Sequence, residues 1–281
     1  MAPSLQDAQI SFVGGGNMAS AIIQGLLAKD IAKQHIFVAE PWDVNRDKMA
    51  ALGVRTTESN VDASRDADIV IIAVKPQVAK AACTELAAAW ADRKQLPLVI
   101  SIAAGIQVAS YIEWFQAGSG RAPPIVRVMP NTPALVGEGA SGLFASDAVS
   151  AAEKDLATAL LASVSRAAEW VDKEQLLDVV TGISGSGPAY FFAFVEHLIT
   201  AGVSLGLSEE QASRLAKQTA LGAGKMLVEA SEPPSQLRKN VTSPNGTTHA
   251  ALVSFENDGL EEIVGRAVKA ATDRAEELGK A

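Results

Sequence analysis

Cysteine is nearly absent from this sequence: its 281 residues include only Cys83, so no disulfide can form within the chain. That usage is typical of a protein kept in a reducing compartment. No run approaches the roughly 18 uninterrupted apolar residues of a membrane-spanning helix, and the N-terminal residues lack the basic and apolar regions of a secretory signal peptide. We therefore expect a soluble, cytoplasmic protein that does not enter a membrane.

Basic charge is also scarce, with 24 Lys and Arg against 32 Asp and Glu and a formal net charge of −8. Proteins that bind nucleic acid or anionic membranes normally carry a basic excess or patch, so neither is an expected partner. Apolar residues make up 48% and charged residues 20% of the chain, a balance that supplies a hydrophobic core. At roughly 100–200 residues per domain, the length allows one large domain or two modest ones.

Histidine, the usual metal ligand and proton carrier, occurs only at His35, His197 and His249. Neither an H-E-x-x-H motif, nor a His/Cys cluster, nor a G-x-S-x-G elbow is present, so we expect no metal. We interpret His35 as a surface residue and His197, in an apolar helix, as a core or interface residue. His249 stays a remote candidate acid.

The first half of the sequence alternates apolar strand-like runs with helical patterns. This alternation predicts βαβ units in a parallel sheet, and therefore an α/β fold. The run at 69–74 is apolar without alternation, as a strand covered on both faces should be. The expected strands are 9–13, 36–39, 69–74, 98–102 and 125–129, and the expected helices are 17–28, 77–90 and 108–116.

Beyond Val171 only helical patterns occur, at 188–200, 208–230, 248–256 and 261–281. Ser208 followed by Gln211 predicts a capping box at the start of one of these helices. We therefore expect two domains: 1–171 with the sheet, and 172–281 composed of helices only.

The motif Gly14-x-Gly16-x-x-Ala19 lies between the first strand and the first helix. Gly14 permits a tight turn, Gly16 allows a pyrophosphate close to the backbone, and Ala19 keeps the helix near the sheet. The pyrophosphate would bind the free amides at the helix N-terminus. The motif therefore predicts a doubly wound, Rossmann-type, dinucleotide-binding domain, with a glycine-rich turn that binds nothing as the alternative.

Glu40 ends the second strand and bears on the identity of the dinucleotide. A carboxylate there suits the ribose 2′-hydroxyl of NAD and repels the 2′-phosphate of NADP. Arg46 could offset that repulsion, so the preference stays open.

Two further segments end strands at the edge where ligands bind in open parallel sheets. Lys75 is interpreted as a phosphate or ribose contact, with a solvated loop lysine as the alternative. Asn131, between Pro130 and Pro133, is either a rigid amide in a cleft or part of a structural turn.

The segments 184–188 (SGSGP) and 242–248 (TSPNGTT) interrupt the helical half. The second offers hydroxyls and free amides without charge, which suits a carboxylate at a helix N-terminus. Alternatively, Thr247 or Thr248 only caps the helix. Reducing a C=N bond needs less acid catalysis than reducing a ketone, because an imine nitrogen can arrive protonated and needs only a hydroxyl partner. The sequence thus favours an imine substrate.

Six segments together resemble pyrroline-5-carboxylate reductases: FVGGGNMA, AVKPQ, SIAAGI, MPNTPALVGEGA, SGSGPAYFF and VTSPNGTT. The resemblance runs from about Ile10 to the last helix. It implies hydride transfer from NADPH, with NADH as the alternative donor, to the C=N carbon of 1-pyrroline-5-carboxylate, giving L-proline in the last step of proline biosynthesis.

The resemblance also implies the site residues, to which the sequence itself adds Glu40. Thr248 would be the catalytic hydroxyl, bonded to the ring nitrogen. The loop that holds the substrate carboxylate would be Ser243, Pro244, Asn245, Gly246 and Thr247. The cofactor-binding residues would be Gly14, Gly15, Gly16, Asn17, Met18, Ala19, Glu40, Asn60, Ala73, Val74, Lys75, Pro76, Ile102, Ala103, Ala104 and Asn240.

Two other functions are considered. The β-hydroxyacid dehydrogenases, which this chain also resembles, carry a G-x-x-G-x-G-x-x-x-K-x-x-x-N pattern at the domain junction. This chain keeps the three glycines, but Phe191 and Val195 stand at the lysine and asparagine positions, so the residue that would protonate a ketone oxygen is absent. A non-catalytic nucleotide sensor would bind the cofactor without turnover, and the intact TSPNGTT loop argues against it.

The expected helix 188–200 carries apolar side chains nearly all around, which requires burial on every side. We predict that the helical domains of two subunits interlock, with a well-covered helix in a monomer as the alternative. The resemblance also suggests homodimers assembled into larger rings.

Overall fold

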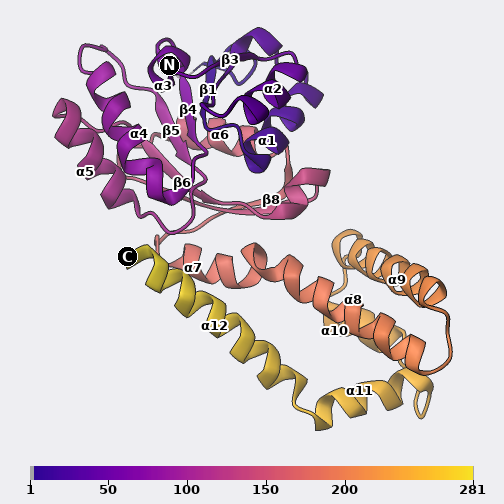
Figure 1. Ribbon diagram of the computed structural model, residues 1–281. Helices are drawn as coiled ribbons and strands as arrows, with labels where there is room; N and C mark the ends of the chain where they lie inside the picture. Colours follow the sequence, from indigo (N-terminus) through magenta and orange to yellow (C-terminus); the bar gives the residue numbers. More distant parts are fainter. Residues whose placement is uncertain (1–2, 281) are drawn as a thin grey trace. The chain divides into compact units, whose positions relative to one another are not determined.

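The computed structural model describes residues 3–280, whose contacts divide the chain into two units (Figure 1). Unit 1 comprises the residues up to Ser186 together with those from Ala271 onward, and unit 2 is Gly187–Ala270. The division therefore falls after Ser186, beyond the domain boundary expected at residue 171. The last helix, α12 (Leu260–Lys280), contributes residues to both units.

Unit 1 contains an eight-stranded sheet in the order β3-β2-β1-β4-β5-β6-β7-β8. The first six positions, from β3 to β6, pair in parallel. β7 is antiparallel to β6, and β8 is parallel to β7. The expected parallel sheet is therefore confirmed from β3 to β6, and β7 and β8 extend it at one edge. The strands are β1 (Ile10–Val13), β2 (Ile36–Ala39), β3 (Arg55–Thr57), β4 (Ile69–Ile72), β5 (Leu98–Ser101), β6 (Ile125–Met129), β7 (Gly139–Ala145) and β8 (Ser165–Trp170).

Helices cover both faces of this sheet, as a doubly wound fold requires. The α-helices of unit 1 are α1 (Asn17–Ala28), α2 (Asp43–Ala51), α3 (Asn60–Ser64), α4 (Pro76–Ala89), α5 (Val108–Ser119), α6 (Ala151–Leu161) and α7 (Leu176–Val180). Short helical turns are η1 (Lys33–His35), η2 (Thr132–Val136) and the π-helical η3 (Thr181–Gly185).

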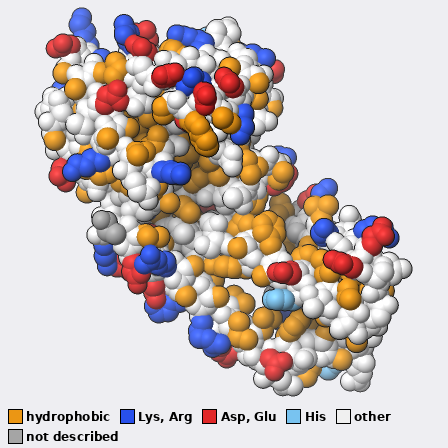
Figure 2. Space-filling model, viewed as in Figure 1, with side chains coloured by type: hydrophobic (Ala, Val, Ile, Leu, Met, Phe, Trp, Pro, Cys, Tyr) orange, Lys and Arg blue, Asp and Glu red, His pale blue; other side chains and the backbone are white. Residues whose placement is uncertain are grey.

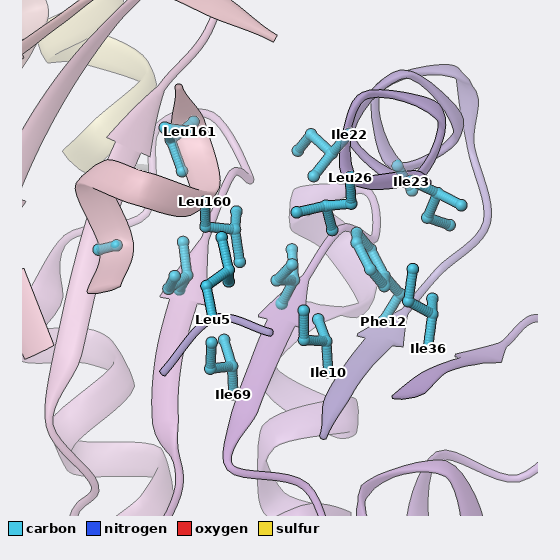
Figure 3. Packing of buried hydrophobic residues seen from close by; sticks show 14 of the residues in the cluster. Leu5, Ile10, Phe12, Ile22, Ile23, Leu26, Ile36, Ile69, Leu160 and Leu161 are labelled. Carbon is cyan, nitrogen blue, oxygen red and sulfur yellow. The ribbon is translucent and has the colours of Figure 1, made fainter. Parts of the chain in front are cut away.

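Alternate residues of each strand enter two separate hydrophobic clusters. Phe12 of β1 faces the cluster that α1 and α6 cover, where Ile22, Leu26 and Leu160 pack (Figure 3). The neighbouring Val13 faces the cluster formed with α4 and α5. Because both faces are covered, β4 reads as the continuous apolar run Ile-Val-Ile-Ile rather than as an alternating pattern.

Three strands were not expected, and each lacks an apolar run. β3 and β8 lie at the two edges of the sheet and carry polar or exposed residues. β7 is rich in small residues because α7 packs close to it: a Cβ at Gly142 would lie 2.8 Å from Cγ1 of Val180. The residues of these three strands therefore reflect their place at a sheet edge or the close packing of a helix, and not a high intrinsic preference for the strand conformation.

Unit 2 is helical, and within the described residues no strand follows Trp170, as expected. Its helices are α8 (Gly187–Ser204), α9 (Glu209–Glu229), α10 (Pro234–Asn240), α11 (Thr247–Asn257) and the first half of α12. The predicted capping box is confirmed: the Ser208 hydroxyl accepts from the Gln211 amide, and the Gln211 side chain accepts from the Ser208 amide.

Large apolar side chains remain on the surface of unit 2, and Figure 2 shows hydrophobic side chains gathered over its helices. On α8, Phe191 and Phe192 are 68% and 69% exposed. Within residues 3–280, no helix has the length and apolar character that a membrane crossing requires.

Candidate functional site

The glycine turn follows β1 directly and approaches the end of β4 very closely. Gly14 has a φ of +103°, a region that glycine favours. A Cβ there would lie 2.7 Å from the carbonyl oxygen of Ala73. The Gly14 amide donates to the carbonyl of Ala39 at 2.8 Å, which ties the turn to β2. Both the turn and its spacing to the neighbouring strand thus require glycine at position 14.

Gly16 is the N-cap of α1 and leaves the start of that helix open. A Cβ on Gly16 would meet no atom within 4 Å, and no side chain caps the helix. Asn17 and Met18 form its first turn, and Ala19 is buried against the core. The amides at this N-terminus are therefore accessible and suited to an anion.

Glu40 follows β2, and its carboxylate is bound to the glycine turn. Oε2 accepts a hydrogen bond from the Gly15 amide at 2.7 Å, and Oε1 accepts one from the Trp42 amide at 3.0 Å. The residue is only 8% exposed. A Cβ on Gly15 would lie 3.3 Å from both Cβ and Cγ of Glu40, so the middle glycine provides the room that Glu40 occupies.

The segments after β4 and β5 lie at the same carboxyl edge. The Ala73 amide donates to the carbonyl of Val13, and the Ile102 amide donates to the carbonyl of Ile72. Lys75 is the N-cap of α4. The structure thus brings together the cofactor residues predicted on the sheet of unit 1: 14–19, Glu40, 73–76 and 102–104.

Two predicted cofactor residues, Asn60 and Asn240, do not belong to these segments: Asn60 lies on α3 of unit 1, and Asn240 lies in unit 2. Asn60 begins α3, and its side-chain amide donates to Glu85 on α4 at 2.8 Å. Asn240 ends α10 in unit 2, where its side-chain oxygen accepts from Gln236.

The predicted substrate loop lies in unit 2, between α10 and α11. Asn245 adopts a left-handed conformation with a φ of +57°. The Gly246 amide donates to the carbonyl of Ser243, and a Cβ on Gly246 would lie 2.4 Å from the Ser243 hydroxyl oxygen. Ser243, Pro244 and Asn245 are exposed. The loop therefore presents an uncharged surface to a ligand.

Helix α11 begins at this loop with Gly246 as its N-cap and no side-chain cap. The alternative in which Thr247 or Thr248 caps the helix is therefore wrong, because both residues lie inside the first turn. Thr248 is half-buried, whereas His249 is exposed. An uncapped first turn is a suitable binding place for a carboxylate.

Sequence reasoning missed a buried charge cluster in unit 1. Arg127 lies in the middle of β6 with 8% of its side chain exposed, 2.9 Å from Glu174 and 3.7 Å from Asp178. Burial raises the pKa of Asp178, and the positive charge of Arg127 partly offsets that rise. A single arginine within the apolar run IVRVM was the available indication.

Asn131 is confirmed as part of a structural turn, the second of its two interpretations. Its amide nitrogen donates to the carbonyl of Ser184, and its oxygen accepts from the amide of Ala140. Both hydrogen-bonding groups of this buried side chain are thus used within unit 1.

Unit 1 also contains a cavity of about 900 Å³ next to part of the predicted cofactor site. Pro76 and Ala104 line it together with Arg127, Met129 and Ser186, whereas no residue of the glycine turn does. Among the described residues, no group of three or more His, Cys, Asp or Glu side chains could hold a metal ion.

Two family models match the chain. Residues 174–278 match the model for pyrroline-5-carboxylate reductase dimerisation, and residues 9–105 match a model described as NADP oxidoreductase, coenzyme F420-dependent. Together they cover the turn at Gly14–Ala19 and the loop at 243–247.

Among curated proteins, the chain is 47% identical over 273 residues to the pyrroline-5-carboxylate reductase of Pseudomonas aeruginosa, with 97% of each chain covered. It is 42% identical over 275 residues to that of Haemophilus influenzae, with 98% of each chain covered.

Solved structures agree with these matches. A pyrroline-5-carboxylate reductase from Coxiella burnetii superposes with a TM-score of 0.91 at 40% identity, covering 98% of this chain and 99% of that one. The Plasmodium falciparum pyrroline carboxylate reductase with NADP bound has a TM-score of 0.80 at 31% identity, with the same coverage.

Proposed function

The chain belongs to the pyrroline-5-carboxylate reductase family, and we propose how its two units divide the family's reaction. It is an NAD(P)H-dependent oxidoreductase that reduces 1-pyrroline-5-carboxylate to L-proline, the last step of proline biosynthesis. The alternative of a β-hydroxyacid dehydrogenase is disfavoured by these comparisons and by Phe191 at the position where that pattern has lysine.

Unit 1 binds the dinucleotide, which supplies the hydride when bound. Gly14 and Gly16 hold its pyrophosphate against the N-terminus of α1. The segments 73–76 and 102–104 contact the dinucleotide along the carboxyl edge of the sheet. The observation that carries this proposal is the close approach of Gly14 to Ala73, combined with the open, uncapped start of α1.

The loop 243–247 of unit 2 binds the carboxylate of the substrate. Its exposed, uncharged residues and the uncapped N-terminus of α11 offer amide and hydroxyl donors. Because the loop carries no acidic residue, it does not repel the carboxylate.

Thr248 accepts a hydrogen bond from the protonated ring nitrogen. The imine nitrogen would carry its proton from solution. A bound NADH or NADPH would supply a hydride to the C=N carbon, the C=N π electrons would become the nitrogen lone pair, and the product would be a secondary amine. Thr248 thus orients the iminium without itself supplying a proton.

Unit 2 also mediates homo-oligomerisation, since the dimerisation model covers residues 174–278. The exposed Phe191, Phe192 and Phe194 on α8 are apolar surface that a second copy of the chain would bury. The finer proposals are that these homodimers assemble into a larger ring and that the protein is cytoplasmic. Light scattering after size-exclusion chromatography tests the assembly, and a stable, active monomer would refute it.

The activity is tested by following the absorbance of the reduced nicotinamide. The absorbance falls when 1-pyrroline-5-carboxylate or a 3-keto acid oxidises NADH or NADPH, and it rises when a 3-hydroxyacid or proline reduces the oxidised dinucleotide. Turnover is expected only with the imine, or with proline in reverse at high pH. Turnover of the hydroxyacids instead would favour the dehydrogenase alternative, and cofactor binding without turnover would favour the nucleotide sensor.

A further inference from the structure

We propose that Glu40 makes this chain bind NADH in preference to NADPH. The inference rests on the proposed function, because it requires the glycine turn to bind a dinucleotide. It concerns the adenosine ribose, whose 2′-oxygen carries hydrogen in NADH and phosphate in NADPH.

The position of the Glu40 carboxylate is fixed by the backbone. Its two oxygens accept from two different amides, those of Gly15 and Trp42. Gly15 belongs to the turn that faces the pyrophosphate, so the carboxylate is held directly beside the cofactor site. In this fold, an acidic residue at the end of the second strand accepts a hydrogen bond from the ribose 2′-hydroxyl.

Glu40 cannot easily leave this position. It is 8% exposed, and its movement would leave the amide hydrogen of Gly15 without its partner. A bound 2′-phosphate would therefore meet a carboxylate that does not turn away. The resulting repulsion acts in partly buried surroundings, where solvent screens it poorly.

Arg46 is a cation close to Glu40 that could offset this repulsion, and it already makes three polar contacts within the chain. Nη1 donates to the carbonyls of Glu40 and Pro41, and Nη2 lies 3.0 Å from Glu58. Its guanidinium therefore stabilises the chain around Glu40 and pairs with a carboxylate. A phosphate would have to displace Glu58, which is itself an anion.

Binding measurements test the proposal without depending on turnover. NADH and NADPH are titrated into the purified protein, and each dissociation constant is obtained by calorimetry. We expect the wild type to bind NADH at least about tenfold more tightly, which corresponds to about 1.4 kcal/mol. In Glu40→Gln, which keeps one oxygen acceptor and removes the charge, the ratio should shrink to within about threefold.

Two further variants separate local from general effects. Asp47→Asn removes one exposed negative charge from α2, the helix that carries Arg46. It should leave the ratio of the NADPH and NADH dissociation constants unchanged. Glu58→Gln releases Arg46 without altering Glu40, and should tighten NADPH binding severalfold while leaving NADH binding unchanged. The side chain of Glu58 is 72% exposed, so Glu58→Gln should fold normally. The proposal can therefore still be tested if Glu40→Gln does not fold.

The outcomes are distinct. Equal or tighter binding of NADPH by the wild type overturns the proposal, as does a Glu40→Gln variant with the wild-type ratio. If neither dinucleotide binds, the proposed function itself fails. Tight binding of both with NADPH favoured leaves the reductase intact and refutes only the role of Glu40.

Discussion

Arg127 on β6 lies 2.9 Å from Oε1 of Glu174. The same carboxylate oxygen accepts a hydrogen bond from the amide of Val108 at the start of α5. The ion pair therefore joins the middle of the sheet, the segment before α7 and the N-terminus of α5. Within such surroundings a charge depends on its partner, because water cannot replace it.

Replacing Arg127 with methionine should destabilise the protein strongly. The substitution leaves the carboxylates of Glu174 and Asp178 near each other without their cation. We expect a loss of about 3–5 kcal/mol in the free energy of unfolding, measured by urea denaturation. The matched control is Arg166→Met, which removes an exposed ion pair with Glu138 and should cost less than about 1 kcal/mol. Similar losses in both variants would contradict this interpretation.

Asp178 should make stability depend on pH in the acidic range. Its folded-state pKa is raised, chiefly by burial, so the native state binds the proton more readily than the unfolded chain does. Its stabilising contribution is therefore present below the unfolded pKa of 3.8 and is lost as pH rises through the folded pKa. The Tm of Asp178→Asn relative to the wild type should accordingly rise across this range. A difference in Tm that is constant with pH would rule the effect out.

Alanine substitutions at two glycines should separate folding from cofactor binding. Gly14→Ala forces a side chain to within 2.7 Å of the Ala73 carbonyl at a positive φ, which should cost about 1–3 kcal/mol of stability. Gly16→Ala meets no neighbour within 4 Å and should fold normally, yet its methyl group would enter the space of the pyrophosphate. Calorimetry with NADH should then show weakened binding in both variants, with a lowered Tm only for Gly14→Ala.

Thr248 is tested by removing its hydroxyl. Thr248→Val should lower kcat roughly 100-fold, which is the size of the loss when one preorganised hydrogen-bonding group is removed from an active site, while the Kd for the dinucleotide stays unchanged. Thr248→Ser retains the hydroxyl and should recover most of the rate. A Thr248→Val enzyme with normal kcat would remove this residue from the mechanism.

Cys83 should be unreactive in the folded protein. The thiol is fully buried on α4, and burial raises its pKa to about 12, so almost none of the reactive thiolate is present at neutral pH. A thiol-reactive chromophore should label it only after denaturation in urea. Rapid labelling of the native protein would show that α4 opens readily.

Local patterns predicted those elements whose residues interact mainly with their own neighbours in sequence. The bounds of α1 were predicted correctly because the glycine turn fixes its start and its apolar face is regular. The Ser208 capping box was likewise readable, since its two partners lie three residues apart. In contrast, β3, β7 and β8 were missed, because their residues are selected by edge position or by the close approach of α7.

The sequence by itself determined that a strand, a glycine turn and a helix follow one another at residues 10–28, because these features depend on adjacent residues. Only the tertiary structure decided that β7 runs against β6, that Glu40 binds the amide of Gly15, and that Arg127 meets Glu174 across 47 positions of sequence. Such pairings depend on which distant segments pack together, and no local periodicity encodes that choice. The physical reason is that burial and charge pairing act through space, whereas propensity acts along the chain.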